Sequence, residues 1–265
     1  MSSLLTSLAA ADILTITLNR PDIHNAFDDR LIDELMQALR SAAQNPDVRL
    51  VVLTGTGKSF SAGADLNWMR RMAVYTEEEN YHDAMALGEL MGTLNRLPKP
   101  TIARVNGSAY GGGVGLIACC DIAIGVTEAQ FALSETKLGL IPAVISPYVV
   151  AAIGEKKSRR YFLTGERFSA AEARAFGLLN EIVPADQLDL AVTRVAALLL
   201  EAGPIAQAEA KDLISAVAHR PVTDSLIADT AERIARVRIS PEGQEGLAAF
   251  LDKRKPNWTR CSKKS

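Results

Sequence analysis

Apolar positions in the first part of the chain follow two different spacings. Residues 13–18 and 50–54 are short runs rich in Ile, Val, Leu and Thr, which predicts two β-strands. Between them, residues 28–45 carry apolar side chains at three- and four-residue intervals, which predicts a helix with Asp28 as its N-cap. Because residues 50–53 are apolar without interruption, we expect that strand to be buried on both faces.

Strand and helix patterns keep alternating as far as residue 203, which predicts an α/β fold with parallel sheets. Ser169 and Glu172 form a predicted capping box for a helix that ends at Gly177. The other predicted strands are residues 4–8, 101–105, 122–125, 129–133 and 178–183, and the other predicted helices are residues 69–72, 77–97, 112–120, 145–153, 156–163 and 188–202. From residue 205 to 252 the pattern is helical without a convincing strand, so we expect a core at residues 1–203 and a helical region at residues 204–265.

Composition excludes several classes of function. The net charge of −2 and the pI near 6.0 argue against nucleic-acid binding. No metal-ligand spacing occurs among the scattered histidines, and no run of 18 apolar residues predicts a membrane span. Three cysteines, two of them adjacent in an apolar run, form no disulfide framework, and no signal-peptide pattern is present. We therefore expect a cytoplasmic protein, with a solvated, disordered tail over its last six residues.

Two clusters of small residues stand out, at residues 61–64 and 111–113. Glycine costs a helix about 1 kcal/mol relative to alanine, so three consecutive glycines that open a predicted helix need a reason. Close approach of another group to the backbone is one reason, and tight turns are another. Backbone N–H groups at the start of a helix also favour negative charge. We therefore expect this segment to present an N–H to a developing oxyanion.

With the pieces SAGADL and AYGGGVGL in this order, the chain resembles the crotonase superfamily, the enoyl-CoA hydratase/isomerase family. Further matching pieces are LNRPDIHNAF, KPTIARVNGSAYGGG, LSETKLGLIP, LTGERFSAAEARAFGLLNEIV and GQEGLAAFLDKRKPNW. The resemblance implies a crotonase-type spiral of ββα units, with C-terminal helices that pack a homotrimer or a homohexamer made of two trimers. It also implies an acyl-CoA substrate, so that coenzyme A enters as part of the thioester and no cofactor is bound permanently.

The resemblance assigns catalytic roles to three positions. Backbone N–H groups of Ala64 and Gly112 are the expected donors to a thioester enolate. Hydratases of the family use two glutamates, of which the second matches Glu135, whereas the first position holds Gly115. We therefore expect Glu135 to be the principal acid/base. Without the resemblance, composition favours an ordinary solvated carboxylate beside Lys137 as the interpretation of Glu135.

Residues that contact the substrate or its coenzyme A moiety are also carried over from the resemblance. We expect Trp68 to line the acyl pocket, or alternatively to be a core or interface aromatic. Candidate partners for a distal carboxylate on the substrate are Arg70, Arg71 and His82, although their pattern favours solvated helix residues. The full set of expected binding residues is His24, Ala26, Ala62, Ala64, Asp65, Leu66, Trp68, Gly112, Phe250 and Lys253.

Residues 138–168 and 239–258 resemble bacterial hydratases of branched, carboxylated enoyl-CoAs. The activities implied are those of 3-methylglutaconyl-CoA and isohexenylglutaconyl-CoA hydratases, in leucine and acyclic-terpene breakdown. A distal substrate carboxylate or an ordered water network would then replace the missing first glutamate. Because one carboxylate suffices to move a proton between carbons, a Δ3,Δ2-enoyl-CoA isomerase is the alternative. A third reading is an acyl-CoA-binding protein with impaired catalysis.

Overall fold

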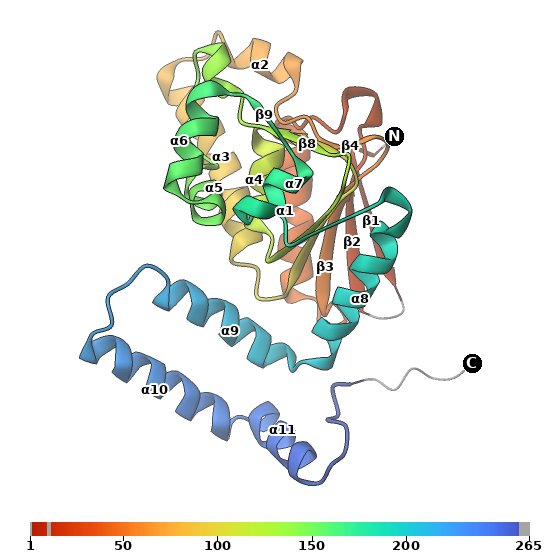
Figure 1. Ribbon diagram of the computed structural model, residues 1–265, viewed down its shortest axis with the longest axis vertical. Coiled ribbons are helices and arrows are strands. Elements are labelled where there is room, and N and C mark those ends of the chain that lie inside the picture. Colours follow the sequence, from red (N-terminus) through yellow and green to blue (C-terminus); the bar gives the residue numbers. More distant parts are fainter. Residues whose placement is uncertain (1, 10–11, 260–265) are drawn as a thin grey trace.

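The computed structural model describes residues 2–9 and 12–259, so Cys261 and the expected disordered tail lie outside the described residues. Ten strands in this range form two sheets, and helices surround them (Figure 1). The six-stranded sheet has the order β1 (Leu4–Ala9), β2 (Ile13–Leu18), β3 (Leu50–Gly55), β5 (Thr101–Val105), β7 (Ile122–Val126) and β10 (Glu181–Val183). The four-stranded sheet has the order β4 (Ser59–Ser61), β6 (Ser108–Tyr110), β8 (Gln130–Ala132) and β9 (Arg167–Ser169).

Successive turns of the chain visit both sheets and then form a helix, which is the expected ββα spiral. β3 and β4 lead to α2 (Leu66–Met72) and α3 (Glu77–Asn95), and β5 and β6 lead to α4 (Gly112–Cys119). The third turn continues from β7 and β8 to α5 (Ser146–Ile153) and α6 (Glu155–Thr164). Three-residue strands such as β4, β6 and β9 escaped the sequence prediction, because so short a segment shows no periodicity.

Most neighbouring strands are parallel, as predicted, but two pairs at sheet edges are not. β1 and β2 form an antiparallel hairpin, and β8 pairs with β9 in antiparallel fashion. β3 is buried along its whole length, which confirms that helices and strands cover both of its faces. The short connection from β1 to β2 allows a hairpin, whereas β8 and β9 are joined through α5 and α6. The inner parallel pairs need crossover connections.

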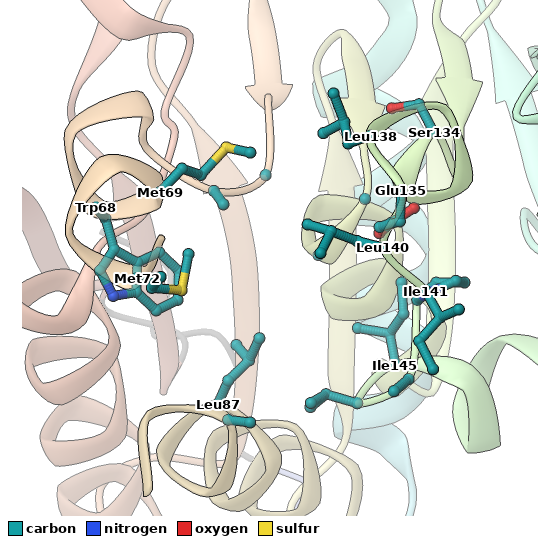
Figure 2. A pocket seen from close by; sticks show the side chains of 18 of the residues that line it. Trp68, Met69, Met72, Leu87, Ser134, Glu135, Leu138, Leu140, Ile141 and Ile145 are labelled. Atoms are coloured by element: carbon teal, nitrogen blue, oxygen red, sulfur yellow. The ribbon is translucent and has the colours of Figure 1, made fainter. Parts of the chain in front are cut away.

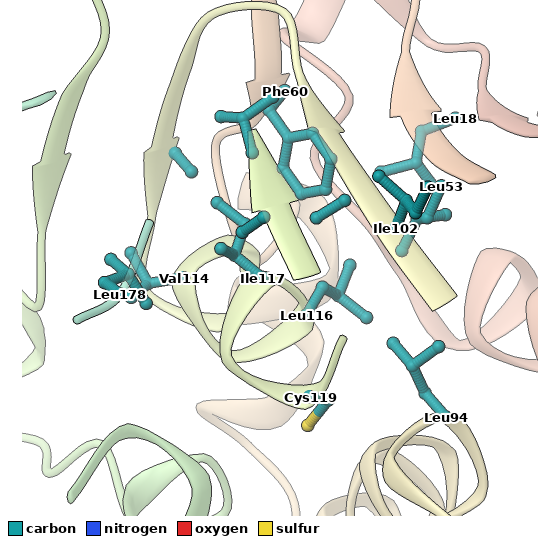
Figure 3. Packing of buried hydrophobic residues seen from close by; sticks show 14 of the residues in the cluster. Leu18, Leu53, Phe60, Leu94, Ile102, Val114, Leu116, Ile117, Cys119 and Leu178 are labelled. Carbon is teal, nitrogen blue, oxygen red and sulfur yellow. The ribbon is translucent and has the colours of Figure 1, made fainter. Parts of the chain in front are cut away.

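The helices begin and end close to the predicted positions. In α1 (Asp29–Gln44) the Asp28 side chain accepts a hydrogen bond from Leu31 N, and Leu35 and Leu39 lie on the buried face. α4 is apolar all round, and its side chains join one core cluster with residues from both sheets (Figure 3). The capping box predicted at the start of α7 (Ala170–Phe176) is present.

The strand predicted at residues 178–183 is wrong in its first half, since β10 begins only at Glu181. Leu178 and Leu179 are buried, but both of their N–H groups donate to Ala173 O at the end of α7. Those helix-terminal hydrogen bonds use the donors that a strand ladder would need. The apolar residues at 178 and 179 therefore correctly indicated burial, but they do not belong to a strand.

The last three helices form a layer below the rest of the molecule (Figure 1). α8 (Leu188–Glu201) ends just before the predicted boundary, and α9 (Pro204–Val217) begins directly after it. α10 (Asp224–Ile239) and α11 (Pro241–Leu251) complete the layer. Lys211 of α9 joins it to the body through a 2.8 Å ion pair with Asp121. None of the helices in the described residues is both long enough and apolar enough to cross a membrane.

Candidate active site

A cavity of about 660 Å³ lies between α2, α3, the start of α4 and the loop at residues 134–145. Met69 and Met72 from α2 line one side, and Leu140 and Ile141 from the loop line the opposite side (Figure 2). Leu87 of α3 lies at its base in the same view. The walls are mainly apolar, so the few polar groups that reach the cavity define its chemistry.

The backbone around Ala64 is held so that its own N–H is left unused. Phe27 N–H donates to Gly63 O at 2.8 Å, and Phe27 O accepts from Asp65 N–H at 2.9 Å. The residues before and after Ala64 thus both hydrogen-bond to Phe27, which forms a parallel β-bridge between Phe27 and Ala64. Within the described part of the chain, no acceptor takes the Ala64 N–H. Ala64 lines the cavity, which makes its N–H available to a ligand there.

The second expected donor, Gly112, is the first residue of α4. Gly111 has φ +49, donates to Ala132 O at 2.9 Å, and accepts from Val114 N–H at 2.9 Å. No acceptor for the Gly112 N–H occurs among residues 2–9 and 12–259. The two donor segments adjoin, since a Cβ atom added to Gly63 would lie 3.6 Å from Gly112 N. The geometry is that of an oxyanion hole, with two free N–H groups at one cavity.

Glu135 reaches the cavity from the start of the 3₁₀ helix at Glu135–Leu138. Its side chain is half-buried and packs near the positive-φ turn, with Oε1 3.0 Å from the position of an added Cβ on Gly111. Oε2 is buried and has no hydrogen-bond partner among the described residues. Burial raises the pKa of this carboxyl above its ordinary value of 4.5. An unpartnered carboxyl beside the donor pair is suited to proton transfer.

The position of the family's first glutamate is closed by an apolar side chain. A Cβ atom on Gly115 would lie 2.2 Å from Cγ2 of Ile145 and 3.3 Å from Cε of Met91. Ile145 is buried and lines the cavity. The structure therefore has hydrocarbon where a second carboxylate would otherwise reach the substrate.

A carboxylate that sequence reasoning missed, Asp83 of α3, also lines the cavity. Its Oδ1 accepts a 3.0 Å hydrogen bond from the indole N–H of Trp68, which is buried and lines the cavity as well. Burial raises the pKa of Asp83, and the hydrogen bond from Trp68 and the charge of Arg71 oppose that rise. Nothing in the sequence singles out Asp83, because its position within a long helix carries no motif.

Several expected binding residues lie outside the cavity lining. Ala62 lines the cavity, whereas His24 and Ala26 do not. His24 is close to the cavity, because His24 O accepts a 2.9 Å hydrogen bond from Ala62 N–H. The Asp65 side chain caps α2 and pairs with Arg20 at 2.9 Å, and Leu66 is 68% exposed.

The basic side chains expected to bind a distal carboxylate of the substrate also lie outside the cavity lining. Arg70 donates to Asn67, Arg71 pairs with Asp29, and His82 lies edge-on to the ring of Tyr81. None of the three lines the cavity. Phe250, which is 81% exposed, and Lys253 are at the end of α11, whereas α2 is at the opposite end of the molecule (Figure 1). Within the described residues, no group of three or more His, Cys, Asp or Glu side chains forms a metal site.

Comparison with known proteins assigns this chain to a family. The family described as enoyl-CoA hydratase/isomerase matches residues 9–261, and the chain belongs to it. The crystal structure of an enoyl-CoA hydratase from Shewanella pealeana is 46% identical, with a TM-score of 0.94 over 97% of this chain and 96% of that one. AtuE of Pseudomonas aeruginosa is 35% identical, with a TM-score of 0.93 over 98% of this chain and 100% of that one. The mitochondrial enoyl-CoA hydratase of Pongo abelii is 34% identical over 246 residues, 92% of this chain and 82% of the relative.

These similarities confirm two expectations from the sequence. The fold is the crotonase type, an α/β spiral followed by C-terminal helices. The chain is an enzyme of the enoyl-CoA hydratase class, whose members are lyases.

Proposed function

We propose that the protein adds water across the 2,3-double bond of an enoyl-CoA, with Ala64 and Gly112 as oxyanion donors and Glu135 as the acid/base. The observation that carries this proposal is the pair of unpaired N–H groups adjoining an unpartnered, half-buried carboxyl at one cavity. The two donors come from segments far apart in sequence, which argues for a role beyond local packing.

In this mechanism the thioester oxygen accepts hydrogen bonds from both backbone N–H groups. Glu135 removes a proton from water as the water oxygen bonds to C3, and negative charge moves to the thioester oxygen. Each preorganised donor stabilises this enolate by roughly 3–4 kcal/mol. The protonated Glu135 then delivers its proton to C2, which completes the addition of one water. Because one carboxyl performs both transfers, both groups add to the same face of the double bond.

For the acyl group, we propose a branched chain of the 3-methylglutaconyl or isohexenylglutaconyl type, as in leucine or acyclic-terpene breakdown. The apolar walls formed by Met72, Leu140, Ile141 and Ile145 support the branched hydrocarbon part. A distal carboxylate has no Lys, Arg or His partner among the lining residues described, and Asp83 opposes it. The carboxylate therefore needs a cation from the rim of the cavity or from a neighbouring subunit.

Isomerisation is the second candidate, and the contact between Gly115 and Ile145 favours it. With hydrocarbon at that position, Glu135 is a lining carboxyl that lies beside a donor segment, with Oε1 3.0 Å from the position of a Cβ on Gly111. A Δ3,Δ2-isomerase needs only such a group, which removes a proton from C2 to form a dienolate and returns it at C4, so that the double bond moves into conjugation with the thioester.

We further propose that the C-terminal helices form a homotrimer or a homohexamer. Ile214, Val222 and Phe250 are exposed apolar side chains of that region, which supports burial against other copies. In such an assembly Phe250 and Lys253 would contact the coenzyme A bound by a neighbouring subunit. The division at residue 203/204 and the cytoplasmic location stay predictions, and sedimentation of the purified protein tests the assembly.

A substrate panel tests the activity. Loss of the conjugated enoyl-thioester absorbance reports hydration, whereas its appearance from a 3-enoyl-CoA reports isomerisation. The panel contains hex-3-enoyl-CoA for isomerisation, and crotonyl-CoA, 3-methylglutaconyl-CoA, isohexenylglutaconyl-CoA and 3-methylhex-2-enoyl-CoA for hydration. The last is an uncharged match for 3-methylglutaconyl-CoA. Binding without turnover of any member would contradict catalysis, and a strong preference for crotonyl-CoA would contradict the branched substrate.

A further inference from the structure

Phe27 contacts both donor segments of the oxyanion hole, through different parts of the residue. Its backbone N–H donates to Gly63 O at 2.8 Å, and its backbone C=O accepts from Asp65 N–H at 2.9 Å. Its ring lies against the second donor, since Cζ would be 2.2 Å from a Cβ added to Gly112. The Ala64 and Gly112 segments therefore meet across this one side chain.

The backbone contact determines where the first donor points. In an extended segment the N–H of one residue and that of the next are directed to opposite sides. Because Asp65 N–H is directed at Phe27, Ala64 N–H is directed away from it. The ring contact acts on the second donor, because the absence of a Cβ at Gly112 lets the start of α4 rest directly on the Cζ edge of the ring.

Phe27 is itself held firmly from both sides. Its ring is buried and lies 6.2 Å from that of Trp68, centroid to centroid, at an interplanar angle of 53°. Trp68 is fixed in turn by its hydrogen bond to Asp83. On the backbone side, the buried Asn25 donates to Thr56 O and Ser59 O at 2.8 Å, which anchors the chain two residues before Phe27.

We propose that Phe27 is a positioning residue of the oxyanion hole, whose ring sets the separation of the two N–H donors. This inference rests on the proposed function, since it requires that Ala64 and Gly112 bind the thioester oxygen. A smaller side chain keeps the backbone pairing but leaves a gap under Gly112, so that the start of α4 no longer has a fixed support.

The test uses Phe27→Leu in the full-length protein, with Phe168→Leu as the matched control. Phe168 is an equally buried phenylalanine that packs on Phe131 and Tyr161 and does not line the cavity. We expect kcat to fall about 10- to 100-fold in Phe27→Leu, below the effect of deleting a donor outright, while KM changes less than about threefold. The Phe168→Leu variant should keep kcat within about twofold of the wild type.

A spectroscopic readout separates positioning from general loosening of the core. A chromophoric thioester, 4-(dimethylamino)cinnamoyl-CoA, absorbs at longer wavelength when hydrogen bonds polarise its carbonyl. We expect a red shift on binding to the wild type and to Phe168→Leu, and a clearly smaller one on binding to Phe27→Leu. If Phe27→Leu does not fold, Phe27→Met replaces it in every arm, because the unbranched side chain of methionine adapts to an irregular space.

The possible outcomes distinguish this inference from the proposed function. Absence of a red shift in the wild type would contradict the oxyanion hole itself. A full red shift and an unchanged kcat in Phe27→Leu would overturn the positioning role and leave the proposed function standing. Equal losses in Phe27→Leu and Phe168→Leu would likewise overturn it, because any core truncation would then have the same effect.

Discussion

Ile145 occupies the space into which a side chain at Gly115 would extend, with its Cγ2 atom only 2.2 Å from the position of that Cβ. The glycine is therefore part of a packed contact between α4 and the loop that carries Glu135. The absence of a carboxylate at position 115 and the presence of the Ile145 side chain in its place therefore belong to one packing contact. This leaves Glu135 and Asp83 as the carboxyls that line the cavity.

The packing at Gly115 predicts a compensating pair of substitutions. Gly115→Ala should destabilise the protein by about 1–3 kcal/mol, because its methyl group overlaps Ile145. Ile145→Ala alone should also destabilise it, by about 2–5 kcal/mol, because it opens a cavity. The double variant should lose less stability than the two single variants lose together, since the new methyl group enters the vacated space. Urea denaturation of all four proteins measures the coupling, and strict additivity would contradict the contact.

Replacement of the acid/base gives the sharpest test of the chemistry. Glu135→Gln keeps the size of the side chain but cannot transfer a proton, so turnover should fall about 10²- to 10⁴-fold. KM should change little, because the oxyanion donors and the walls of the cavity remain. Glu128→Gln is the matched control, at an exposed glutamate bonded to Thr127 outside the cavity lining. Unchanged turnover in Glu135→Gln would exclude Glu135 as the acid/base.

The raised pKa of Glu135 predicts how stability depends on pH. Burial makes the folded state hold this proton at pH values where the unfolded state, with an ordinary pKa near 4.5, has already released it. The folded state then binds more protons than the unfolded state, so this group lowers the free energy of unfolding as pH rises from 4.5 through the folded-state pKa.

Glu135→Gln removes that dependence. We expect the variant to gain stability relative to the wild type as pH rises from 4.5 to 8, which chemical denaturation at several pH values measures. Hydration by the wild type should fall as pH drops through a midpoint above 4.5, where the base becomes protonated. A stability difference that is constant with pH would show that the folded-state pKa is not raised.

Asp83 predicts a change in substrate preference. Asp83→Asn removes the negative charge but keeps an oxygen that accepts the hydrogen bond of Trp68. We expect the ratio of kcat/KM for 3-methylglutaconyl-CoA over 3-methylhex-2-enoyl-CoA to rise several-fold, because repulsion of the distal carboxylate is relieved. An unchanged ratio would show that the far end of the acyl group does not approach Asp83.

Asp83→Leu is the companion variant for the structural part of the contact. It removes the acceptor as well as the charge and leaves the buried Trp68 N–H without a partner, which should cost about 1–3 kcal/mol of stability. Asp83→Asn should be clearly more stable than Asp83→Leu in thermal denaturation. Equal stabilities would contradict the importance of the hydrogen bond.

Sequence periodicity and local motifs determined most of the fold. Residues 28–45 and 50–54 showed their helix and strand directly, because amphipathic spacing and continuous burial are local properties. The glycine cluster at residues 111–113 and the small residues at 61–64 stood out as local clusters, and the family resemblance made them the expected donor segments. Where the pattern was too short, as in β4 and β9, or where helix-terminal hydrogen bonds intervened, as at Leu178, the sequence was insufficient.

Only the tertiary structure decided how the site is completed. The roles of Phe27, Asp83 and Ile145 depend on contacts between segments that are distant along the chain and carry no motif. The sequence showed that Gly115 lacks a carboxyl, but the packing showed that Ile145 fills the space. A sequence lists the groups available to a site, whereas their burial, their free hydrogen-bonding capacity and their neighbours arise only when the chain is folded.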